Sequence, residues 1–278
     1  MDTRIVAALA CPHDGDRVVL DGRTVRCPAG HAFDLARQGY VNLLAGRDPG
    51  TGDDAAMIAA RTRVLDAGRF APVSAALADL VARHAAPDGI VVDLGGGTGH
   101  HLAAVLDAVP DRVGVTLDLS KPAVRRAARA HPRAGAVVAD VWRGLPLRDG
   151  TAAAVTCVFA PRNAPEIARV LHPDGVLVVV TPMPHHLREL VQPLGLLEID
   201  PRKEERLLAT LDPATVEVGT VRRVETRWRL DHADIRATVA MGPSADHLTA
   251  DEVVDRVAQL PPEMSVTAAV ELRLFRPR

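Results

Sequence analysis

Aromatic residues and cysteines are scarce in this sequence of 278 residues. Phe, Trp and Tyr make up 3 % of the chain, so any core must be built mainly from aliphatic side chains. The hydrophobic content of 47 % is high enough for one full α/β core, with a smaller segment left over. Three cysteines are too few for a disulfide framework in a chain of this length.

Long apolar runs and an excess of charge of one sign are also missing. The longest apolar stretch, Gly175 to Thr181, is strand-sized and too short to span a bilayer. The first residues lack the basic segment, apolar run and cleavage site of a signal peptide. A formal net charge of −2 argues against binding polyanions through bulk charge, although a local basic surface is enough to bind RNA. We therefore expect a soluble, cytoplasmic protein.

The first 45 residues differ in pattern from the rest and end in a linker. Two short alternating pieces, Arg17 to Leu20 and Thr24 to Arg26, flank the dipeptide Asp21-Gly22, which is typical of hairpin turns. The glycine-rich stretch from Gly46 to Gly52 then indicates a boundary. We predict a small N-terminal module at residues 1–45 and a larger domain at residues 46–278.

The N-terminal module carries residues at nearly the spacing of a zinc ribbon. Cys11, Cys27 and His31 supply two thiolates and an imidazole, and Asp14 stands where such a ribbon has its second cysteine. Zinc also accepts a carboxylate oxygen or a further imidazole. We therefore expect the metal to be held by these three residues, with Asp14 or the neighbouring His13 as the fourth ligand. The alternative is a degenerate ribbon that binds no metal.

From residue 90 onward, apolar strand-like runs alternate with helix-like segments. The predicted strands are 90–93, 112–119, 136–141, 152–159 and 175–181, and the predicted helices between them are 101–108, 122–130 and 164–171. Helices are also expected at 55–67 and 72–84. Continuous apolar strands that alternate with helices indicate a parallel sheet covered on both faces. Two longer strands, 216–230 and 265–275, would complete a seven-stranded, doubly wound α/β sheet.

The first predicted strand ends in Asp93-Leu-Gly95-Gly-Gly97-Thr-Gly99-His100. A dinucleotide fingerprint needs its third glycine at position 100, so this turn is of a different kind. Glycines at alternate positions let a ligand lie against bare backbone, because any Cβ would collide with it. The alternative is a tight glycine turn between strand and helix with a purely structural role.

Two acidic residues make the cofactor interpretation stronger. Asp118 ends the second predicted strand, where a carboxylate can accept hydrogen bonds from both ribose hydroxyls. Asp140 ends the third, where a carboxylate followed by an apolar residue can bind an adenine amino group and pack its ring. The carboxyl ends of consecutive parallel strands line the crevice where such sheets bind ligands. This arrangement resembles the class I (Rossmann-like) methyltransferases, which use S-adenosylmethionine.

Several further segments extend the likeness over essentially the whole chain. They are residues 31–44, 65–70, 93–101, 160–163, 181–187 and 240–244. Together with the Cys–His module they resemble the RlmA family of zinc-ribbon methyltransferases that modify a guanine in 23S ribosomal RNA. The glycine loop and the segment around Arg162 are most similar to the actinobacterial, tylosin-resistance (TlrB-like) branch. The sequence departs from the family pattern at Asp14.

The resemblance implies a substrate, partners and roles for individual residues. The product would be a guanine methylated at its ring nitrogen N1 in a hairpin loop of 23S ribosomal RNA, made by a homodimer and conferring macrolide resistance. The cofactor would be S-adenosylmethionine, bound near Phe70, His100 and His186 as well as the glycine turn. Arg162 and Asn163 would lie at the target base, where Arg162 can stabilise the enolate form of guanine and His186 can relay its proton. The module at residues 1–45 would contact the RNA loop.

Two other functions are compatible with parts of the sequence. A small-molecule methyltransferase acting on a natural product would share the cofactor residues, but it gives no reason for the Cys–His module. A ribbon-bearing RNA-binding protein that has lost catalysis would have no need of an intact glycine turn.

Overall fold

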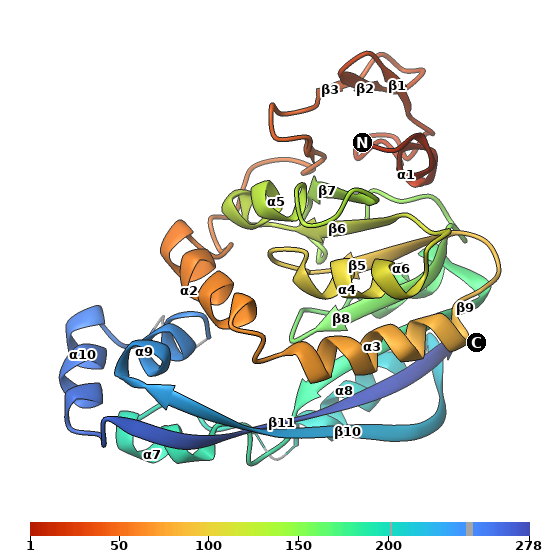
Figure 1. Ribbon diagram of the computed structural model, residues 1–278. Coiled ribbons are helices and arrows are strands. Elements are labelled where there is room, and N and C mark those ends of the chain that lie inside the picture. The colour runs from red at the N-terminus through yellow and green to blue at the C-terminus, as the bar shows by residue number, and fades with distance from the viewer. Residues whose placement is uncertain (201, 243–246) are drawn as a thin grey trace.

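The computed structural model describes residues 1–200, 202–242 and 247–278 and is organised around an eight-stranded sheet (Figure 1). The strands are β4 (Val41–Asn42), β5 (Ile90–Leu94), β6 (Gly114–Asp118), β7 (Ala134–Val138), β8 (Ala152–Val158), β9 (Leu171–Pro182), β10 (Thr215–Asp231) and β11 (Glu263–Pro277). Their order is β10-β11-β9-β8-β5-β6-β7-β4. Within this sheet β11 runs antiparallel to both its neighbours, and the strands from β9 to β4 are parallel.

Helices cover both faces of the sheet, as the doubly wound pattern predicted. They are α1 (Thr3–Ala8), α2 (Ala55–Asp66), α3 (Ala71–His84), α4 (His100–Ala108), α5 (Lys121–Ala127), α6 (Ala164–Val170), α7 (Arg188–Leu194), α8 (Lys203–Leu211), α9 (His232–Ala240) and α10 (Ala250–Ala258). One buried cluster joins α3, α4, α7 and α9 to one face of the sheet, and another joins α1, α6 and α8 to the other. In the part of the chain that the structure describes, no helix is both long and apolar enough to cross a membrane.

The predicted α/β fold is confirmed, and seven of the eight strands are those expected from the sequence. The third of them, β7, ends at Val138 rather than at residue 141. The carboxylate of Asp140 accepts a hydrogen bond from the backbone N–H of Trp142 at 3.0 Å, and such a local bond competes with extended backbone. The motif segment 240–244 is described only as far as residue 242, so Pro243 and Ser244 lie outside the described residues.

The N-terminal module forms a separate antiparallel sheet of three strands, β1 (Val19–Asp21), β2 (Thr24–Arg26) and β3 (Ala32–Asp34). The expected hairpin is present, but its turn lies one residue later than predicted. Asp21 pairs with Thr24 across the two strands, so Gly22 and Arg23 form the loop. Gly22 has a φ of +59°, which glycine adopts readily at the first position of a two-residue hairpin loop.

The same segment also enters the main sheet and its core, which the sequence did not indicate. β4 pairs in parallel with β7 and becomes the eighth strand. The side chain of Ile5, in α1, is fully buried against Gly135 of β7, and Leu9 forms a backbone bridge with Leu147. Buried residues of the module belong to the same cluster as those of β5, β6 and β8. A functional boundary between residues 45 and 46 therefore stays a prediction, and one continuous core spans it.

This shared core leads to a prediction about unfolding. Replacing Ile5 by alanine should lower the free energy of unfolding of the whole chain by about 2–4 kcal/mol, because a fully buried isoleucine is lost from beneath the main sheet. The fluorescence of Trp142 and Trp228, which both lie in the second part of the chain, reports the transition during denaturant titration. Val19→Ala, at a side chain that is 59 % exposed, is the control and should leave the midpoint unchanged. A tryptophan transition that does not move in Ile5→Ala would show that the two parts unfold independently.

Candidate active site and metal centre

The chain leaves β5 and β8 in opposite directions at the carboxyl ends of these strands, and this part of the structure is called the crevice below. The loop after β5 leads to α4 on one face of the sheet, and the loop after β8 leads to α6 on the other, which makes this the switch point of the topology. The two loops touch, because a Cβ at Gly95 would lie only 2.7 Å from the Cβ of Ala160. The glycine turn that the sequence singled out thus lies at the place where open α/β sheets bind ligands.

The glycines of this turn meet different surroundings. Gly99 precedes α4 with a φ of +75°, and a Cβ there would approach the Cα of Ala127 in α5 to 3.1 Å. At Gly97 the nearest atom to such a Cβ would be a guanidinium nitrogen of Arg61, at 3.3 Å, which is the end of a flexible side chain. Gly95 and Gly99 are therefore required by packing between fixed elements. Gly97 is also buried, but what covers it is the movable side chain of Arg61.

Asp118 holds the turn from the end of β6. One carboxylate oxygen accepts a hydrogen bond from the N–H of Gly97 at 2.9 Å, and the other accepts one from the N–H of Ser120 at 2.8 Å. Burial raises the pKa of this carboxyl, while the two N–H groups act in the opposite direction. The predicted ribose acid is thus half-buried, fixed in orientation and in direct contact with the glycine turn.

Asp93 lies beneath the turn and is fully buried. One of its oxygens accepts a hydrogen bond from the hydroxyl of Thr156 at 2.7 Å, and the other has no partner within the described residues. Burial raises the pKa of Asp93 to about 7. The unpartnered oxygen occupies the space that a Cβ at Gly96 would need. We infer that Asp93 supports the turn from below and adds negative charge beneath a cationic cofactor only when it is ionised.

Asp140 lies within the loop after β7, and Asn163 holds the same loop from the start of α6. Asp140 pairs with Arg143 at 3.4 Å, and Arg143 also donates to the backbone carbonyls of Ala45 and Arg47. The side-chain amide of Asn163 donates to the carbonyl of Val141 at 3.1 Å, and its oxygen caps α6. Both residues thus have structural partners. The role of Asp140 toward adenine and that of Asn163 at the target base stay predictions.

Three aromatic rings meet beside the loop after β8. Phe70 is 3 % exposed and packs its ring against Trp228 and Phe159, with centroids 5.0 and 5.9 Å apart. Phe159 directly follows β8, is 44 % exposed and has a φ of +54°. The sequence analysis missed Phe159, because neither its exposure nor its left-handed backbone has a signal in the sequence. The buried ring of Phe70 is placed to support Phe159 from behind.

The remaining candidate residues surround the same crevice. The ring of His186 lies 6.1 Å from that of Phe159, and its Nδ1 accepts a hydrogen bond from the N–H of Ala269 at 3.1 Å. His100 begins α4 at the end of the glycine turn, and burial lowers its pKa. Arg162 follows Phe159 by three residues and is half-buried, and this burial lowers the pKa of its guanidinium. The structure therefore gathers the predicted cofactor and catalytic residues at one end of the sheet.

The metal-ligand candidates of the module also converge. The ligand atoms of Cys11, Asp14, Cys27 and His31 all lie within 4.8 Å of one another. Nδ1 of His31 lies 3.5 and 3.4 Å from the two sulfur atoms, close to the separation of about 3.5 Å expected for a tetrahedral zinc with bonds of about 2.3 and 2.0 Å. An oxygen of Asp14 is 2.9 Å from the same nitrogen.

His13, the other candidate for the fourth ligand, is placed differently. Its ring packs against those of His31 and Phe33, with centroids 4.7 and 5.8 Å apart. The described geometry thus favours Asp14 as the fourth ligand. The donor set fits zinc, and ligation itself stays a prediction.

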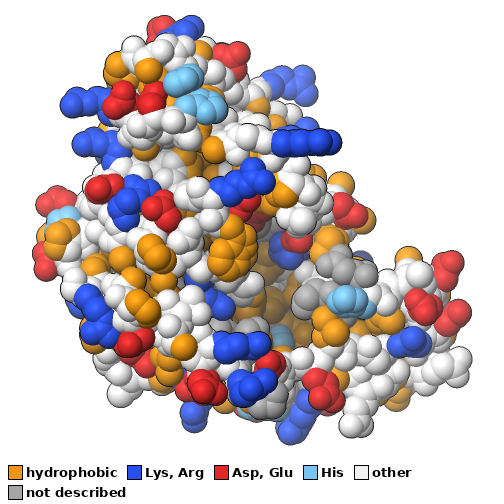
Figure 2. Space-filling view, turned by 180° about the vertical axis from the view of Figure 1, so that it is seen from behind, with side chains coloured by type: hydrophobic (Ala, Val, Ile, Leu, Met, Phe, Trp, Pro, Cys, Tyr) orange, Lys and Arg blue, Asp and Glu red, His pale blue; other side chains and the backbone are white. Residues whose placement is uncertain are grey.

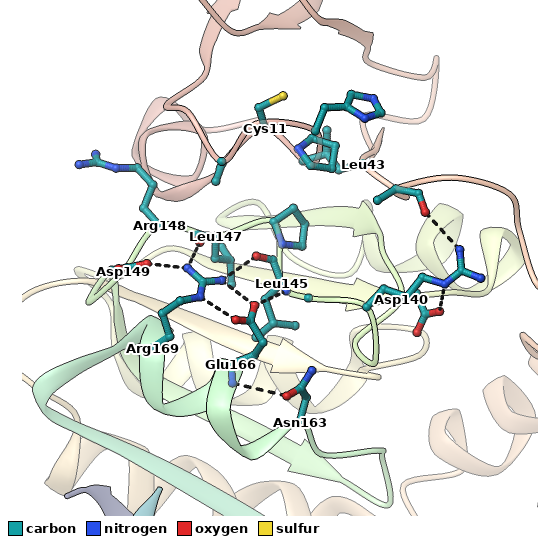
Figure 3. A pocket seen from close by; sticks show the side chains of 18 of the residues that line it. Cys11, Leu43, Asp140, Leu145, Leu147, Arg148, Asp149, Asn163, Glu166 and Arg169 are labelled. Carbon is teal, nitrogen blue, oxygen red and sulfur yellow. Dashed lines mark hydrogen bonds and ion pairs between the residues drawn. The ribbon is translucent and has the colours of Figure 1, made fainter.

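A pocket of about 780 Å³ lies between the module and the main sheet (Figure 3). On the module side it is lined by Cys11 and His13, and on the sheet side by Asp140, Trp142 and Asn163. Figure 3 shows Asn163 and the ion pair of Glu166 with Arg169 at its base, on the sheet side. The indole of Trp142 is 64 % exposed. The metal cluster and the loops around the cofactor crevice therefore border one hollow.

The contacts of Asp118 lead to a prediction about cofactor affinity. Asp118→Ala removes the acceptor for the ribose hydroxyls and frees the N–H of Gly97. Charge-assisted hydrogen bonds contribute about 1.5–3 kcal/mol, so S-adenosylmethionine should bind about ten- to a hundredfold more weakly. Asp107→Ala, at an exposed carboxylate in α4, is the control. Unchanged affinity of Asp118→Ala by calorimetry would remove Asp118 from the cofactor site.

A second prediction concerns the metal. Protein purified without chelator should contain one zinc per chain by elemental analysis. Asp14→Ala should lose most of it, Asp14→Cys should retain it against higher chelator concentrations, and Asp16→Ala should resemble the unaltered protein, because only position 14 lies in the cluster. Zinc-free protein with a folded module would show that the aspartate abolished the site.

Comparisons with known proteins agree with this geometry. The family model described as "RlmA, N-terminal" matches residues 9–47, and that of a methyltransferase domain matches residues 91–175. The chain is 52 % identical to the 23S rRNA (guanine(748)-N(1))-methyltransferase of Streptomyces fradiae, across 100 % of this chain and 99 % of the relative. Two relatives described as "Putative 23S rRNA (guanine-N(1)-)-methyltransferase", from Micromonospora griseorubida and Bacillus subtilis (strain 168), are 54 % and 32 % identical, across 92 % and 87 % of this chain and 91 % and 88 % of the relatives.

The glycine turn with its strand-end carboxylates agrees with the matched methyltransferase domain, and the grouped thiols, imidazole and carboxylate agree with the matched N-terminal module. With identity of this level over its full length, the chain belongs to the RlmA family of 23S rRNA (guanine-N1)-methyltransferases, alongside the enzyme of Streptomyces fradiae.

Proposed function

We propose that this enzyme transfers a methyl group from S-adenosylmethionine to N1 of a guanine in a hairpin loop of 23S ribosomal RNA. The observation that carries the proposal is the common pocket between the ribbon and the sheet. It joins a module of the type that reads unpaired RNA loops to the loops around the cofactor crevice. The names of the full-length relatives support the same substrate.

The charge distribution suits an RNA loop better than a long duplex. Four exposed arginines lie on the ribbon: Arg17, Arg23, Arg26 and Arg37. Figure 2 shows a hollow in the face of the molecule opposite to that of Figure 1, with hydrophobic side chains inside it and basic ones around its rim. With a net charge of −2, binding should depend only modestly on salt, and loop shape and base contacts should supply much of the selectivity.

Methylation at N1 of guanine requires that its proton be removed, which leaves negative charge on the neighbouring carbonyl oxygen. Bound S-adenosylmethionine supplies the electrophilic methyl group, and the chain must align the acceptor nitrogen and exclude water. We assign Arg162 to the oxygen, because a guanidinium at the crevice stabilises a developing oxyanion. Asn163 would position the loop that carries Arg162, and His186 would accept or relay the proton.

We assign the stacking surface for the target guanine to Phe159. A non-glycine residue at φ +54° is unfavourable unless the surrounding structure enforces it, and such residues gather at functional sites. Here the N–H of Phe159 donates to the carbonyl of Val180 at 3.1 Å, which fixes the strained residue at the sheet end. The ring is thereby held partly exposed between Phe70 and His186, beside the glycine turn. Unpaired bases stack on aromatic side chains placed in this way.

Several properties implied by the resemblance remain part of the proposal. A homodimer would grip the RNA from two sides, and sedimentation equilibrium tests it. An enzyme acting on ribosomal RNA would work in the cytoplasm. Resistance to macrolides would be measured as growth of a sensitive host that expresses the chain.

Incubation of the protein with radiolabelled S-adenosylmethionine and ribosomal RNA separates this function from its two rivals. Labelled RNA whose modified base is 1-methylguanine by mass spectrometry supports the proposal. A small-molecule methyltransferase would label no RNA, and a catalytically silent RNA-binding protein would bind the RNA hairpin without labelling it. A different methylated base would reject the guanine-N1 assignment while leaving the methyltransferase assignment intact.

The role of Phe159 gives a quantitative expectation. Base–aromatic stacking contributes about 1–3 kcal/mol, so Phe159→Ala should lower kcat/KM for the RNA hairpin by roughly five- to a hundredfold. Phe159→Tyr keeps the ring and should restore most of the rate. The affinity of either variant for S-adenosylmethionine should stay within twofold of the unaltered protein, which controls for damage to the crevice. Full activity of Phe159→Ala would exclude the stacking role.

A further inference from the structure

A closed circuit of contacts surrounds Gly97 in the glycine turn. Asp118 bonds to the N–H groups of Gly97 and of Ser120. The hydroxyl of Ser120 donates to the backbone carbonyl of Asp53 at 2.6 Å, and the carboxylate of Asp53 pairs with Arg61 at 2.5 Å. The guanidinium of Arg61 lies against Gly97 and closes the circuit. Asp53 and Arg61 thus belong to the surroundings of the cofactor turn, although they come from the region of α2.

Contacts to each of its two residues hold the Arg61–Asp53 pair beside the glycine turn. Asp54 caps α2 through the N–H of Met57, which leaves the carboxylate of Asp53 available to Arg61. Arg61 also donates to the backbone carbonyl of Met241, at the end of α9, at 3.0 Å. The two side chains of the pair are 27 % and 29 % exposed, so both remain partly accessible. An ion pair that only fastened α2 to the body of the protein would not need to lie on a ligand-binding turn.

The charges of Arg61 and Asp53 influence the pKa values of the ionisable groups around the turn. Burial is the largest influence on both neighbouring groups, raising the pKa of Asp118 and lowering that of His101. The positive charge of Arg61 acts to lower both pKa values, and Asp53 acts to raise that of Asp118. The pair therefore presents a positive and a negative group side by side, next to the carboxylate that suits a ribose. S-Adenosylmethionine has the complementary form, because its nucleoside continues into an amino-acid end with one carboxylate and one ammonium group.

We propose that Arg61 and Asp53 bind the amino-acid end of S-adenosylmethionine, with Arg61 at its carboxylate and Asp53 at its ammonium group. A guanidinium matches a carboxylate with two parallel N–H donors, which adds specificity as well as affinity. When the cofactor binds, Arg61 turns from Asp53 toward the carboxylate of the cofactor. The ammonium group of the cofactor then pairs with Asp53 in place of Arg61. The assignment concerns the cofactor alone and holds whichever substrate is methylated.

The test uses two ligands that differ only at the proposed contact. S-Adenosylhomocysteine has the amino-acid end, and 5′-methylthioadenosine keeps the nucleoside and the thioether without it. By calorimetry, Arg61→Gln should raise the Kd of S-adenosylhomocysteine about ten- to a hundredfold and leave that of 5′-methylthioadenosine within twofold. Asp118→Ala should weaken both ligands, because both contain the ribose. Arg63→Gln, an exposed arginine of the same helix paired with Asp234, should weaken neither.

A third ligand separates the two residues of the pair. Decarboxylated S-adenosylmethionine retains the ammonium group and lacks the carboxylate. Its affinity should be insensitive to Arg61→Gln and should fall in Asp53→Asn. Arg61→Lys, which keeps the charge but loses the forked donors, should raise the Kd of S-adenosylhomocysteine severalfold and leave that of 5′-methylthioadenosine unchanged. It serves as the second variant if Arg61→Gln does not fold.

Two outcomes would overturn the assignment. Equal weakening of S-adenosylhomocysteine and 5′-methylthioadenosine in Arg61→Gln and Arg61→Lys would mean that the pair only fastens α2 to the glycine turn. Unchanged affinity for both ligands in these variants would remove Arg61 from the cofactor site. Neither result depends on RNA, so a failure here is distinguishable from a failure of the proposed substrate.

Discussion

The turn from β5 into α4 is packed against other elements of the fold at several of its residues. Gly95 packs against Ala160 in the loop after β8, and Gly99 packs against Ala127 in α5. The buried carboxyl of Asp93 fills the space next to Gly96. Close packing of this kind leaves the backbone one conformation. The N–H of Gly97 consequently points in one direction, and Asp118 is oriented by accepting from it. The geometry of the whole cofactor site depends on this constraint.

The same constraint connects distant parts of the chain to the site. The loop after β8 cannot move away from Gly95 without losing its contact, so Phe159 and Arg162 are held near the turn. On the other side, β4 adds to the edge of the sheet beside β7, and Arg143 joins the linker after β4 to Asp140. The ribbon is thereby fastened to the loop that borders the predicted adenine position. A loop of RNA held by the ribbon would lie close to the cofactor.

The aspartate at position 14 of the ribbon departs from the family pattern but can still serve as a zinc ligand. A cysteine thiolate and an aspartate carboxylate each carry one negative charge, so Asp14 in place of a second cysteine leaves the net charge of a zinc site unchanged. The carboxylate oxygen binds zinc at a shorter distance than sulfur does, about 2.0–2.2 Å against 2.3 Å. The oxygen of Asp14 lies 2.9 Å from Nδ1 of His31 and 3.3 Å from the sulfur of Cys27, so it is near enough to both to share a metal ion with them.

The sequence by itself determined the fold class, the glycine turn, Asp118 and the four metal-ligand candidates, because these depend on local spacing and on the alternation of strands and helices. Only the tertiary structure decided that Asp14 rather than His13 faces the cysteines, that β4 joins the main sheet, and that Asp53, Arg61 and Phe159 surround the crevice. Arg61 lies 36 positions before Gly97 in the sequence and makes its contact through the packing of α2 across the sheet end. Phe159 is exposed because a strained backbone is enforced by its neighbours. Such contacts arise from the packing of remote segments, and no local pattern in the sequence encodes them.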